Sequence, residues 1–348
     1  MVSIVTINDD LYERYSSYTK GKAMARFGHD LEWALALRDT YGVSIEHLVA
    51  LDGERVVGVC PFFLCKPIFG GAHYQTSLFP SYFGPLYDSD DVLNAILEEI
   101  NKRTSQLQYT EILSPEALPI PAIGFTPFVE NLDSTFLLSL SDGIDAVFNK
   151  FSRDIKRILR KAKDLEEVKL VVDTEGKFIP EFYKLYVSIY AHKHGFIPHV
   201  KRLFENIFLR YPNGQARIYL VEINRKFKGG VFTFCRHNEI YYAWSAVRPD
   251  SVYHPTHFLI WKIIQDGVAE GFPLFNMGES QLQNEGLAHF KKGWGTEMKQ
   301  PIRYLIPGQE AFPTVRLFER FSWAHNVIAR LPTSVITGIL SPAIRYFL

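Results

Sequence analysis

The segment FNMGES at residues 275–280, followed by FKKGWG at 290–295, is the most informative part of this 348-residue sequence. The first segment is an apolar run that ends in polar residues, as a buried strand does at the rim of a sheet. Ligands of α/β proteins collect beyond the carboxyl ends of strands. Asn276 offers an amide there, Glu279 a carboxylate and Lys291 a cation. A surface loop with an ordinary exposed lysine accounts for the same residues, so both interpretations stay open.

Composition and charge indicate a globular protein without a general affinity for polyanions. Hydrophobic residues make up 47% of the chain, and 38 basic residues balance 38 acidic ones. A nucleic-acid contact would therefore need a local patch. The three cysteines, Cys60, Cys65 and Cys235, have no CxxC spacing, which predicts neither disulfides nor a metal site. Without a signal-peptide pattern or a long apolar run, we expect a cytoplasmic protein.

The order of predicted elements indicates an α/β protein with two domains. At 348 residues the chain exceeds one small core. Two apolar runs at 46–51 and 55–64 flank Asp52-Gly53, a strong hairpin signal. A second hairpin is expected at 216–235, and both halves follow the order helix, helix, hairpin, strand, long helix, strand. We predict domains at 1–133 and 134–310, with mixed, mostly antiparallel sheets, and a helical tail at 311–348.

Two segments combine basic residues with apolar ones. In the tail, arginines alternate with aromatic residues, which suits packing against the body or peripheral contact with a membrane. A helix at about 153–162 carries Arg157, Arg160 and Lys161 among other cations at helical spacing. Such a face is either merely solvated or binds phosphates, which arginine contacts bidentately.

An ordered set of motifs in the second half resembles the Fem-type (FemABX-like) branch of the GNAT acyltransferase superfamily. The resemblance covers about residues 134–306 and follows the first domain only in outline. Its motifs are RDIKRILRKA at 153–162, GGVF at 229–232, YYAWSA at 241–246, Pro255 with Trp261, GF at 271–272, FNMG at 275–278, and FKxxWG at 290–295.

The resemblance implies two tandem GNAT-like domains and transfer of an aminoacyl or acyl group to an amine. Lys291 matches the lysine of the family's FKxx-aromatic-Gly motif, where an ammonium can stabilise the oxyanion that forms when a carbonyl is attacked. The attacking amine must also lose a proton, and Glu279 is our candidate base. The acceptor would be a phosphate-bearing or lipid-linked cell-envelope precursor of the peptidoglycan type, or another glycoconjugate.

Further residues are expected to bind the substrates, in a groove between the domains. Arg157, Arg160 and Lys161 would lie near phosphates, and a tRNA acceptor arm is a possible partner of this face. Strand alternation would place Tyr242 and Trp244 on one face, which lines the groove. Candidates from the motifs complete the set: Asn276, Ser280 and Trp294.

The donor stays open between aminoacyl-tRNA and acyl-CoA, and no tightly bound cofactor or metal is expected. Acetyl-CoA enzymes cradle a pyrophosphate on a glycine-rich turn, whereas residues 247–255 contain two prolines and no glycine. No long coiled-coil pattern, such as some Fem proteins insert for tRNA, interrupts the second domain. The alternatives are a CoA-dependent N-acetyltransferase and a non-catalytic protein that binds a nucleotide- or lipid-linked sugar.

Overall fold

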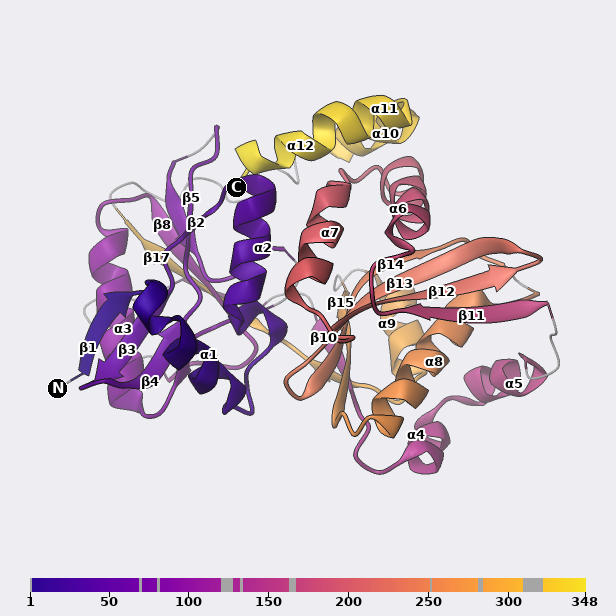
Figure 1. Ribbon diagram of the computed structural model, residues 1–348, viewed down its shortest axis with the longest axis horizontal. Coiled ribbons are helices and arrows are strands. Elements are labelled where there is room, and N and C mark those ends of the chain that lie inside the picture. The colour runs from indigo at the N-terminus through magenta and orange to yellow at the C-terminus, as the bar shows by residue number, and fades with distance from the viewer. Residues whose placement is uncertain are drawn as a thin grey trace. The chain divides into compact units, whose positions relative to one another are not determined.

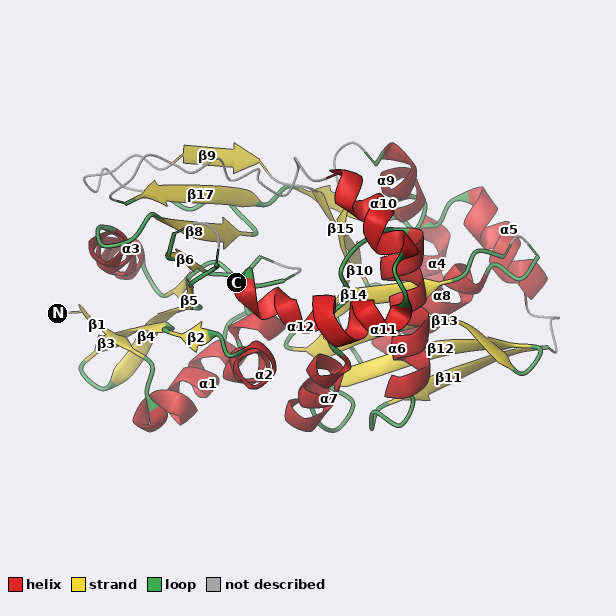
Figure 2. Ribbon diagram, turned by 90° about the horizontal axis from the view of Figure 1, so that it is seen from above, coloured by secondary structure: helices red, strands yellow, loops and turns green. Residues whose placement is uncertain are grey.

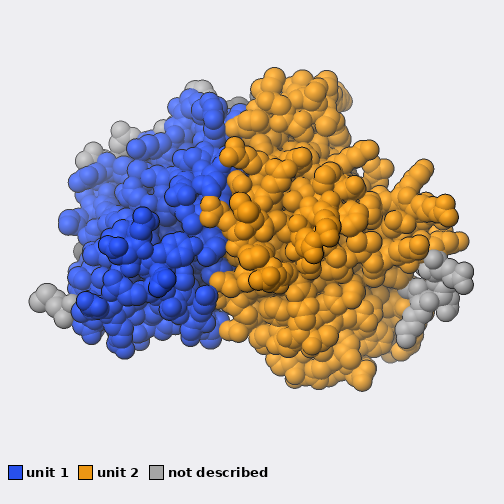
Figure 3. Space-filling model, in the orientation of Figure 1, with its two compact units in different colours: residues 1–133, 300–320, 343–348 blue, residues 134–299, 321–342 orange. Residues whose placement is uncertain are grey.

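The computed structural model divides the chain into two compact units (Figure 3). Unit 1 comprises Met1–Asp133, Gln300–Arg320 and Ala343–Leu348, and unit 2 comprises Ser134–Lys299 and Phe321–Pro342. The structure describes residues 2–68, 71–79, 82–119, 128–131, 134–162, 167–250, 252–280, 284–308 and 322–348.

Unit 1 contains two sheets and three α-helices among its described residues (Figure 1). Its four-stranded sheet has the order β1 (Val2–Thr6), β3 (Leu48–Asp52), β4 (Arg55–Cys60) and β7 (Leu86–Tyr87). Its six-stranded sheet has the order β2 (Ser44–Ile45), β5 (Phe63–Cys65), β6 (His73–Gln75), β8 (Tyr109–Ser114), β17 (Ile302–Pro307) and β9 (Phe128–Asn131). The α-helices are α1 (Tyr12–Lys20), α2 (Leu31–Tyr41) and α3 (Asp90–Thr104). The predicted hairpin at Asp52-Gly53 is formed by β3 and β4.

Helix α3 is the long helix that precedes the last strand of the first half. Acidic residues occupy its first turn and basic residues its last turn, which complements the helix dipole. Leu93, Ile96 and Ile100 recur at helical spacing and are fully buried in the core of unit 1. The apolar face therefore holds α3 against the sheets.

Strand β17 corrects the predicted extent of the second domain. We expected residues 134–310 to form one domain, yet Ile302–Pro307 pairs with β8 and β9 in the six-stranded sheet of unit 1. The pairing joins segments nearly two hundred residues apart, and no local sequence pattern encodes such a partner.

Unit 2 is built on one seven-stranded sheet, mixed but mostly antiparallel. The strand order is β11 (Val168–Asp173), β12 (Ala216–Ile223), β13 (Lys226–Arg236), β14 (Glu239–Val247), β15 (Leu274–Ser280), β10 (Ser134–Ser139) and β16 (Glu297–Lys299). Its helices are α4 (Ile144–Lys150), α5 (Arg153–Ala162), α6 (Ile179–Val187) with the π-helical turn Ser188–Lys193, α7 (Lys201–Arg210), α8 (Pro255–Ala269) and α9 (Glu285–Lys292), followed by tail helices. Both units thus confirm the predicted α/β class.

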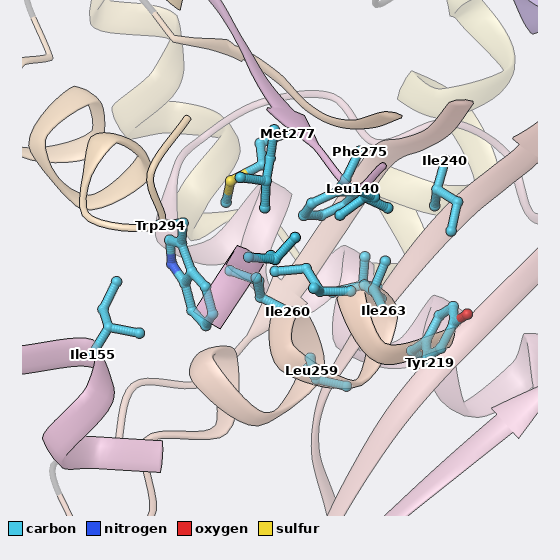
Figure 4. Close-up of a cluster of buried hydrophobic side chains, with 14 of the residues drawn as sticks. Leu140, Ile155, Tyr219, Ile240, Leu259, Ile260, Ile263, Phe275, Met277 and Trp294 are labelled. Atoms are coloured by element: carbon cyan, nitrogen blue, oxygen red, sulfur yellow. The ribbon is translucent and has the colours of Figure 1, made fainter. Parts of the chain in front are cut away.

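Helices α6 and α8 cover opposite faces of this sheet (Figure 1). Ile260 and Ile263 of α8 are buried together with Phe275 and Met277 of β15 (Figure 4). Gly271 follows α8 with φ +78°, the left-handed conformation that glycine commonly adopts just after the end of a helix. The helix thereby leads directly into β15, whose far end carries the candidate site.

The tail helices pack against unit 2. Helix α10 (Ser322–Arg330) is followed by α11 (Thr333–Val335), a π-helical turn at Ile336–Leu340 and α12 (Ser341–Ala343), and these lie beside α6 (Figure 2). Ile336 is buried with Val187 and Ala191 of the α6 segment. Packing against the body is therefore the structure of this part of the tail, while predicted tail residues at 311–321 lie outside the described residues. Among the described helices, none has the length and apolar character needed to span a membrane.

Candidate functional site

The candidate site lies where strands β14 and β15 separate. The two strands pair in parallel at three positions, ending with Tyr241 opposite Asn276. Beyond that point β14 continues alongside β13, and β15 continues alongside β10. Gly278 adopts φ +69°, where a glycine carries no steric cost, and the register of β10 against β15 shifts close by. The polar end of β15 therefore leaves the parallel ladder.

Lys291 brings a buried cation to this end of β15. It lies on α9, and only 6% of its surface is exposed. Its Nζ donates hydrogen bonds to the carbonyl oxygens of Gly278 at 3.0 Å and Glu279 at 2.7 Å. The ammonium also lies 5.3 Å from the ring centroid of Phe136. Burial lowers the pKa of Lys291 to about 8.

One of the three N–H groups of Lys291 remains available. An ammonium has three donors, and the two carbonyl oxygens use two of them. Within the described part of the chain, no further acceptor contacts this nitrogen. The described contacts thus hold the ammonium in place and leave one of its donors without an acceptor among the described residues.

Glu279 is held by a neutral donor. The hydroxyl of Tyr241 donates to both carboxylate oxygens, at 3.1 and 3.4 Å. Burial raises the pKa of Glu279 above its ordinary value, because desolvation disfavours the charged form. Tyr241 is fully buried and comes from β14, so the carboxylate is positioned from across the strand separation.

Lys291 and Glu279 approach β15 from its two faces. Phe136, beneath the ammonium, belongs to the core that α8 covers. Tyr241 alternates along β14 with Ile240, which belongs to that same core, so Tyr241 projects to the opposite face. The cation and the carboxylate are therefore joined through the backbone of β15, since Lys291 bonds the carbonyl oxygen of Glu279.

The side-chain amide of Asn276 forms hydrogen bonds within the protein. Its Oδ1 accepts from the Thr135 hydroxyl at 3.1 Å and from the amide of Gly278 at 2.9 Å. Its Nδ2 donates to Glu239 at 3.2 Å. These bonds fix the turn at Gly278 and leave the amide a positioning role.

Ser280 sits opposite Ser134 on β10 at the end of the same ladder. Its hydroxyl is buried and has no hydrogen-bond partner among the described residues. A buried unpaired hydroxyl costs free energy unless a water molecule or ligand satisfies it. Ser280 therefore keeps its place among the candidate binding residues.

A β-bulge corrects the expectation that Tyr242 and Trp244 share one face. Thr233 pairs with Tyr242 and Phe232 pairs with Trp244, so one extra residue, Ala243, is inserted into β14. Such an insertion reverses the side on which later residues project. Tyr242 contacts Phe275 beneath α8, whereas Trp244 is buried against Phe204 of α7 and against Phe232. Two residues apart, they line opposite faces.

Trp294 occupies the position of a core residue. It is fully buried and packs against Phe151, His257 and Phe290 (Figure 4). The WG motif therefore fixes α9, and with it Lys291, against the body of unit 2. The indole nitrogen has no hydrogen-bond partner among the described residues.

The predicted basic helix is α5, and its cations face solvent. Ile155 and Leu159 are buried in the core of unit 2, which turns the other side outward. Arg160 and Lys161 are exposed, and Arg157 pairs with Asp154 at 3.0 Å while 65% of its side chain stays exposed. The face is accessible to a phosphate-bearing ligand, as a merely solvated face is.

In the glycine-free turn before α8, backbone amides donate hydrogen bonds to a carboxylate. Asp250 accepts hydrogen bonds from the backbone N–H groups of Val252 and Tyr253, both at 2.9 Å. These bonds lower the pKa of Asp250. The amides and the anion at this turn thus oppose binding of a pyrophosphate there. Sequence reasoning noted the missing glycine but not this carboxylate, which an Asx-turn pattern could have revealed.

Comparison with known proteins identifies the class to which this site belongs. The model of the acetyltransferase (GNAT) domain family matches residues 149–292, which include β14, β15 and α9. No curated protein matches the chain. The match and the fold together assign a domain of the acetyltransferase (GNAT) type to unit 2.

Solved structures extend the likeness to most of the chain. A crystal structure of FemX is 15% identical, with a TM-score of 0.69, over 87% of this chain and 97% of that one. A tandem GNAT protein from the clavulanic acid biosynthesis pathway is 13% identical, with a TM-score of 0.54, over 90% of this chain and 100% of that one. The C-terminal domain of a putative lysylphosphatidylglycerol synthetase from Agrobacterium fabrum is 12% identical, with a TM-score of 0.56, over 95% of this chain and 98% of that one. The predicted Fem-like GNAT resemblance is thus confirmed for the fold.

Proposed function

We propose that this protein transfers an aminoacyl or related acyl group from an activated ester onto an amine of a cell-envelope glycoconjugate. The acceptor amine attacks the donor carbonyl, and a tetrahedral intermediate with an oxyanion forms. The new C–N bond forms in this addition step, and the C–O bond to the leaving group breaks when the intermediate collapses and the carbonyl is restored. The amine proton leaves through a base, and the leaving alkoxide takes up a proton.

The buried ammonium of Lys291 is the observation that carries this proposal. Keeping Lys291 charged costs free energy, because burial disfavours the charged form of the side chain. One of its N–H groups has no acceptor among the described residues, and we assign it to the oxyanion beside the polar end of β15. In a poorly solvated site, a prepositioned cation stabilises a developing oxyanion far more than it would in water.

Glu279 supports the proton transfer that the same reaction requires. Burial raises the pKa of its carboxyl group, which brings it closer to the pKa range of an effective base near neutral pH. Tyr241 orients the carboxylate by donating to both oxygens. We assign Glu279 the role of accepting the proton of the attacking amine.

The turn around Asp250 favours an aminoacyl ester over a CoA thioester as the donor. A coenzyme A pyrophosphate needs open amides at the start of α8, and the Asp250 carboxylate occupies those of Val252 and Tyr253. An aminoacyl-tRNA presents its ester at the end of a ribose and places no pyrophosphate next to it. The cations of α5, including Arg157 and Arg160, would contact phosphates of the donor or of a lipid-linked acceptor.

Replacing Lys291 by alanine tests this proposal, with Lys292→Ala as the matched control. Lys292 is the next residue on α9 and is exposed. Lys291→Ala is expected to lower kcat by about 10²–10³-fold, the usual cost of removing an oxyanion donor, while Lys292→Ala keeps wild-type turnover. Transfer is measured with purified protein and a panel of aminoacyl-tRNA and acyl-CoA donors, well below the thermal midpoint.

The same assay separates the alternatives. Turnover with acetyl-CoA alone would identify a CoA-dependent N-acetyltransferase. Binding of a nucleotide- or lipid-linked sugar without turnover by any donor would identify a non-catalytic binding protein. Wild-type turnover of a folded Lys291→Ala variant would remove Lys291 from the mechanism.

A further inference from the structure

A small exposed cluster in unit 1 combines apolar, aromatic and basic side chains. The final residues of the chain pair with the segment after β5: Lys66 N–H donates to the carbonyl of Leu348 at 3.0 Å, and Ile68 N–H donates to that of Tyr346 at 2.9 Å. Ile68 is 61% exposed, Tyr346 42% and Phe347 44%. We name these three residues, with Lys66 and Arg345, the terminal patch.

The backbone bonds hold the apolar side chains of the terminal patch in water. Large apolar side chains this exposed usually occur singly, whereas backbone pairing brings Ile68 next to Tyr346. Arg345 stacks on the Tyr346 ring, with its guanidinium carbon 4.4 Å from the ring centroid, and donates to the Tyr346 hydroxyl. The patch is thus a preformed surface.

Charge indicates what kind of surface covers the terminal patch. Both Lys66 and Arg345 are exposed, and the sequences CKPI at 65–68 and SPAIRYFL at 341–348 contain no acidic residue. An aromatic residue with an apolar neighbour and flanking cations is the composition found at the headgroup level of membranes. Anionic lipid headgroups would pair with the cations while the apolar side chains enter the acyl boundary.

We propose that the terminal patch docks unit 1 on an anionic membrane surface. This inference rests on the proposed function, because an acceptor anchored in a leaflet is reached only by an enzyme at that leaflet. Of the two alternatives for the tail, packing against the body holds for α10 to α12, through residues such as Ile336, and the proposed membrane contact is limited to the last residues, of which Tyr346 and Phe347 are 42% and 44% exposed.

Vesicle co-sedimentation of the full chain tests the docking without any substrate. The protein is expected to bind phosphatidylcholine vesicles that contain phosphatidylglycerol, and to bind pure phosphatidylcholine vesicles at least tenfold more weakly, on the order of the loss of two basic contacts. The triple variant Ile68→Ser, Tyr346→Ser, Phe347→Ser should lower binding to anionic vesicles by a further factor of about ten or more. Leu209→Ser is the control, since Leu209 on α7 is 78% exposed but lies outside the patch.

The outcomes distinguish a surface that docks on a membrane from an interface between two copies of the chain. Wild-type protein that stays in the supernatant with anionic vesicles, or a triple variant that binds them like wild type, would overturn the proposal. Self-association that the triple variant abolishes in the absence of lipid would instead mark the patch as an interface between two copies. Transfer to a water-soluble amine acceptor should be equal in wild type and the triple variant, so failure of docking and failure of the transferase proposal are distinguishable.

Discussion

Among the described residues, each unit has one short parallel strand pair, and the two pairs hold nearby acidic residues in different ways. In unit 1, β6 and β8 pair in parallel and Gln75 lies opposite Glu111. In unit 2, β14 and β15 also pair in parallel, and Glu279 lies further along β15, beyond the paired positions. In both, a long helix, α3 or α8, leads into the second strand.

The partners of the two carboxylates differ in charge. Glu111 forms an ion pair with Arg303 of β17 at 3.1 Å. Glu279 instead receives hydrogen bonds from the neutral Tyr241, and burial raises its pKa. A carboxylate beside a guanidinium stays ionised as a structural ion pair, whereas one held by a tyrosine can take up a proton. Similar topology thus holds a structural ion pair in unit 1 and, in our proposal, the base of the reaction in unit 2.

Exchanging each carboxylate for its amide tests this difference with the largest expected effect. Glu279→Gln removes the proposed base and should lower kcat by about 10²–10⁴-fold with little change in thermal midpoint. Glu111→Gln should leave kcat unchanged and lower the free energy of unfolding, because it removes the negative charge that pairs with Arg303. Turnover and thermal unfolding of both variants are compared. Equal kinetic losses would show that the units are not divided in this way.

The pH dependence of transfer sharpens the role of the buried cation in unit 2. Burial lowers the pKa of Lys291 to about 8, so the ammonium loses its proton as the pH rises through that value. We expect kcat/KM to fall above pH 8 by about tenfold per pH unit. In Lys291→Arg the side chain stays charged, so any residual activity should lack this decline. A wild-type profile that is flat up to pH 10 would contradict the assignment.

Local patterns were sufficient to predict much of unit 2. The hairpin predicted at 216–235 is formed by β12 and β13, because apolar runs on both sides of a polar turn define its two strands. The FKxxWG motif pointed to Lys291, which is buried beside β15. Whether its ammonium acts on a substrate stays a prediction.

Pairing between distant strands and local irregularities within a strand could not be predicted from the sequence. Strand β17 joins unit 1 through partners far away in the chain. The bulge at Ala243 separates Tyr242 from Trp244, although regular alternation predicts one face for both. Tyr241 escaped notice because a buried tyrosine in an aromatic-rich strand is indistinguishable by sequence from packing. The role of its hydroxyl becomes visible only when the structure places it in hydrogen-bond contact with Glu279.

The exposed cations of α5 should affect substrate binding more than turnover. Changing Arg157 and Arg160 to glutamine removes two charges from a solvent-facing surface and should raise the KM of a phosphate-bearing substrate about tenfold, with kcat nearly unchanged. The effect should shrink at high salt, since exposed charges are screened. Lys201→Gln on α7, another exposed cation, is the control. An unchanged KM would mark α5 as a solvated face.

The smallest effect concerns a histidine in unit 1 that contributes to stability alone. His47 is fully buried, and its Nδ1 accepts the N–H of Phe62 at 2.9 Å. Burial lowers the pKa of His47 to about 4, so the folded protein keeps it neutral while the unfolded chain protonates near pH 6.5. The unfolded state then binds more protons between these values, and stability falls as the pH drops through this window.

Acidification from pH 6.5 to 5.5 should therefore lower the free energy of unfolding by about 1 kcal/mol through His47. In His47→Asn the side-chain oxygen can still accept the Phe62 amide, but no proton is taken up, so that part of the slope should vanish. His199 of unit 2, whose pKa burial lowers to about 3, acts in the same direction and remains in the variant. Denaturant unfolding at several pH values measures the difference in slope. Identical slopes in wild type and variant would mean that His47 gains its proton without unfolding, and that unit 1 opens locally around β4.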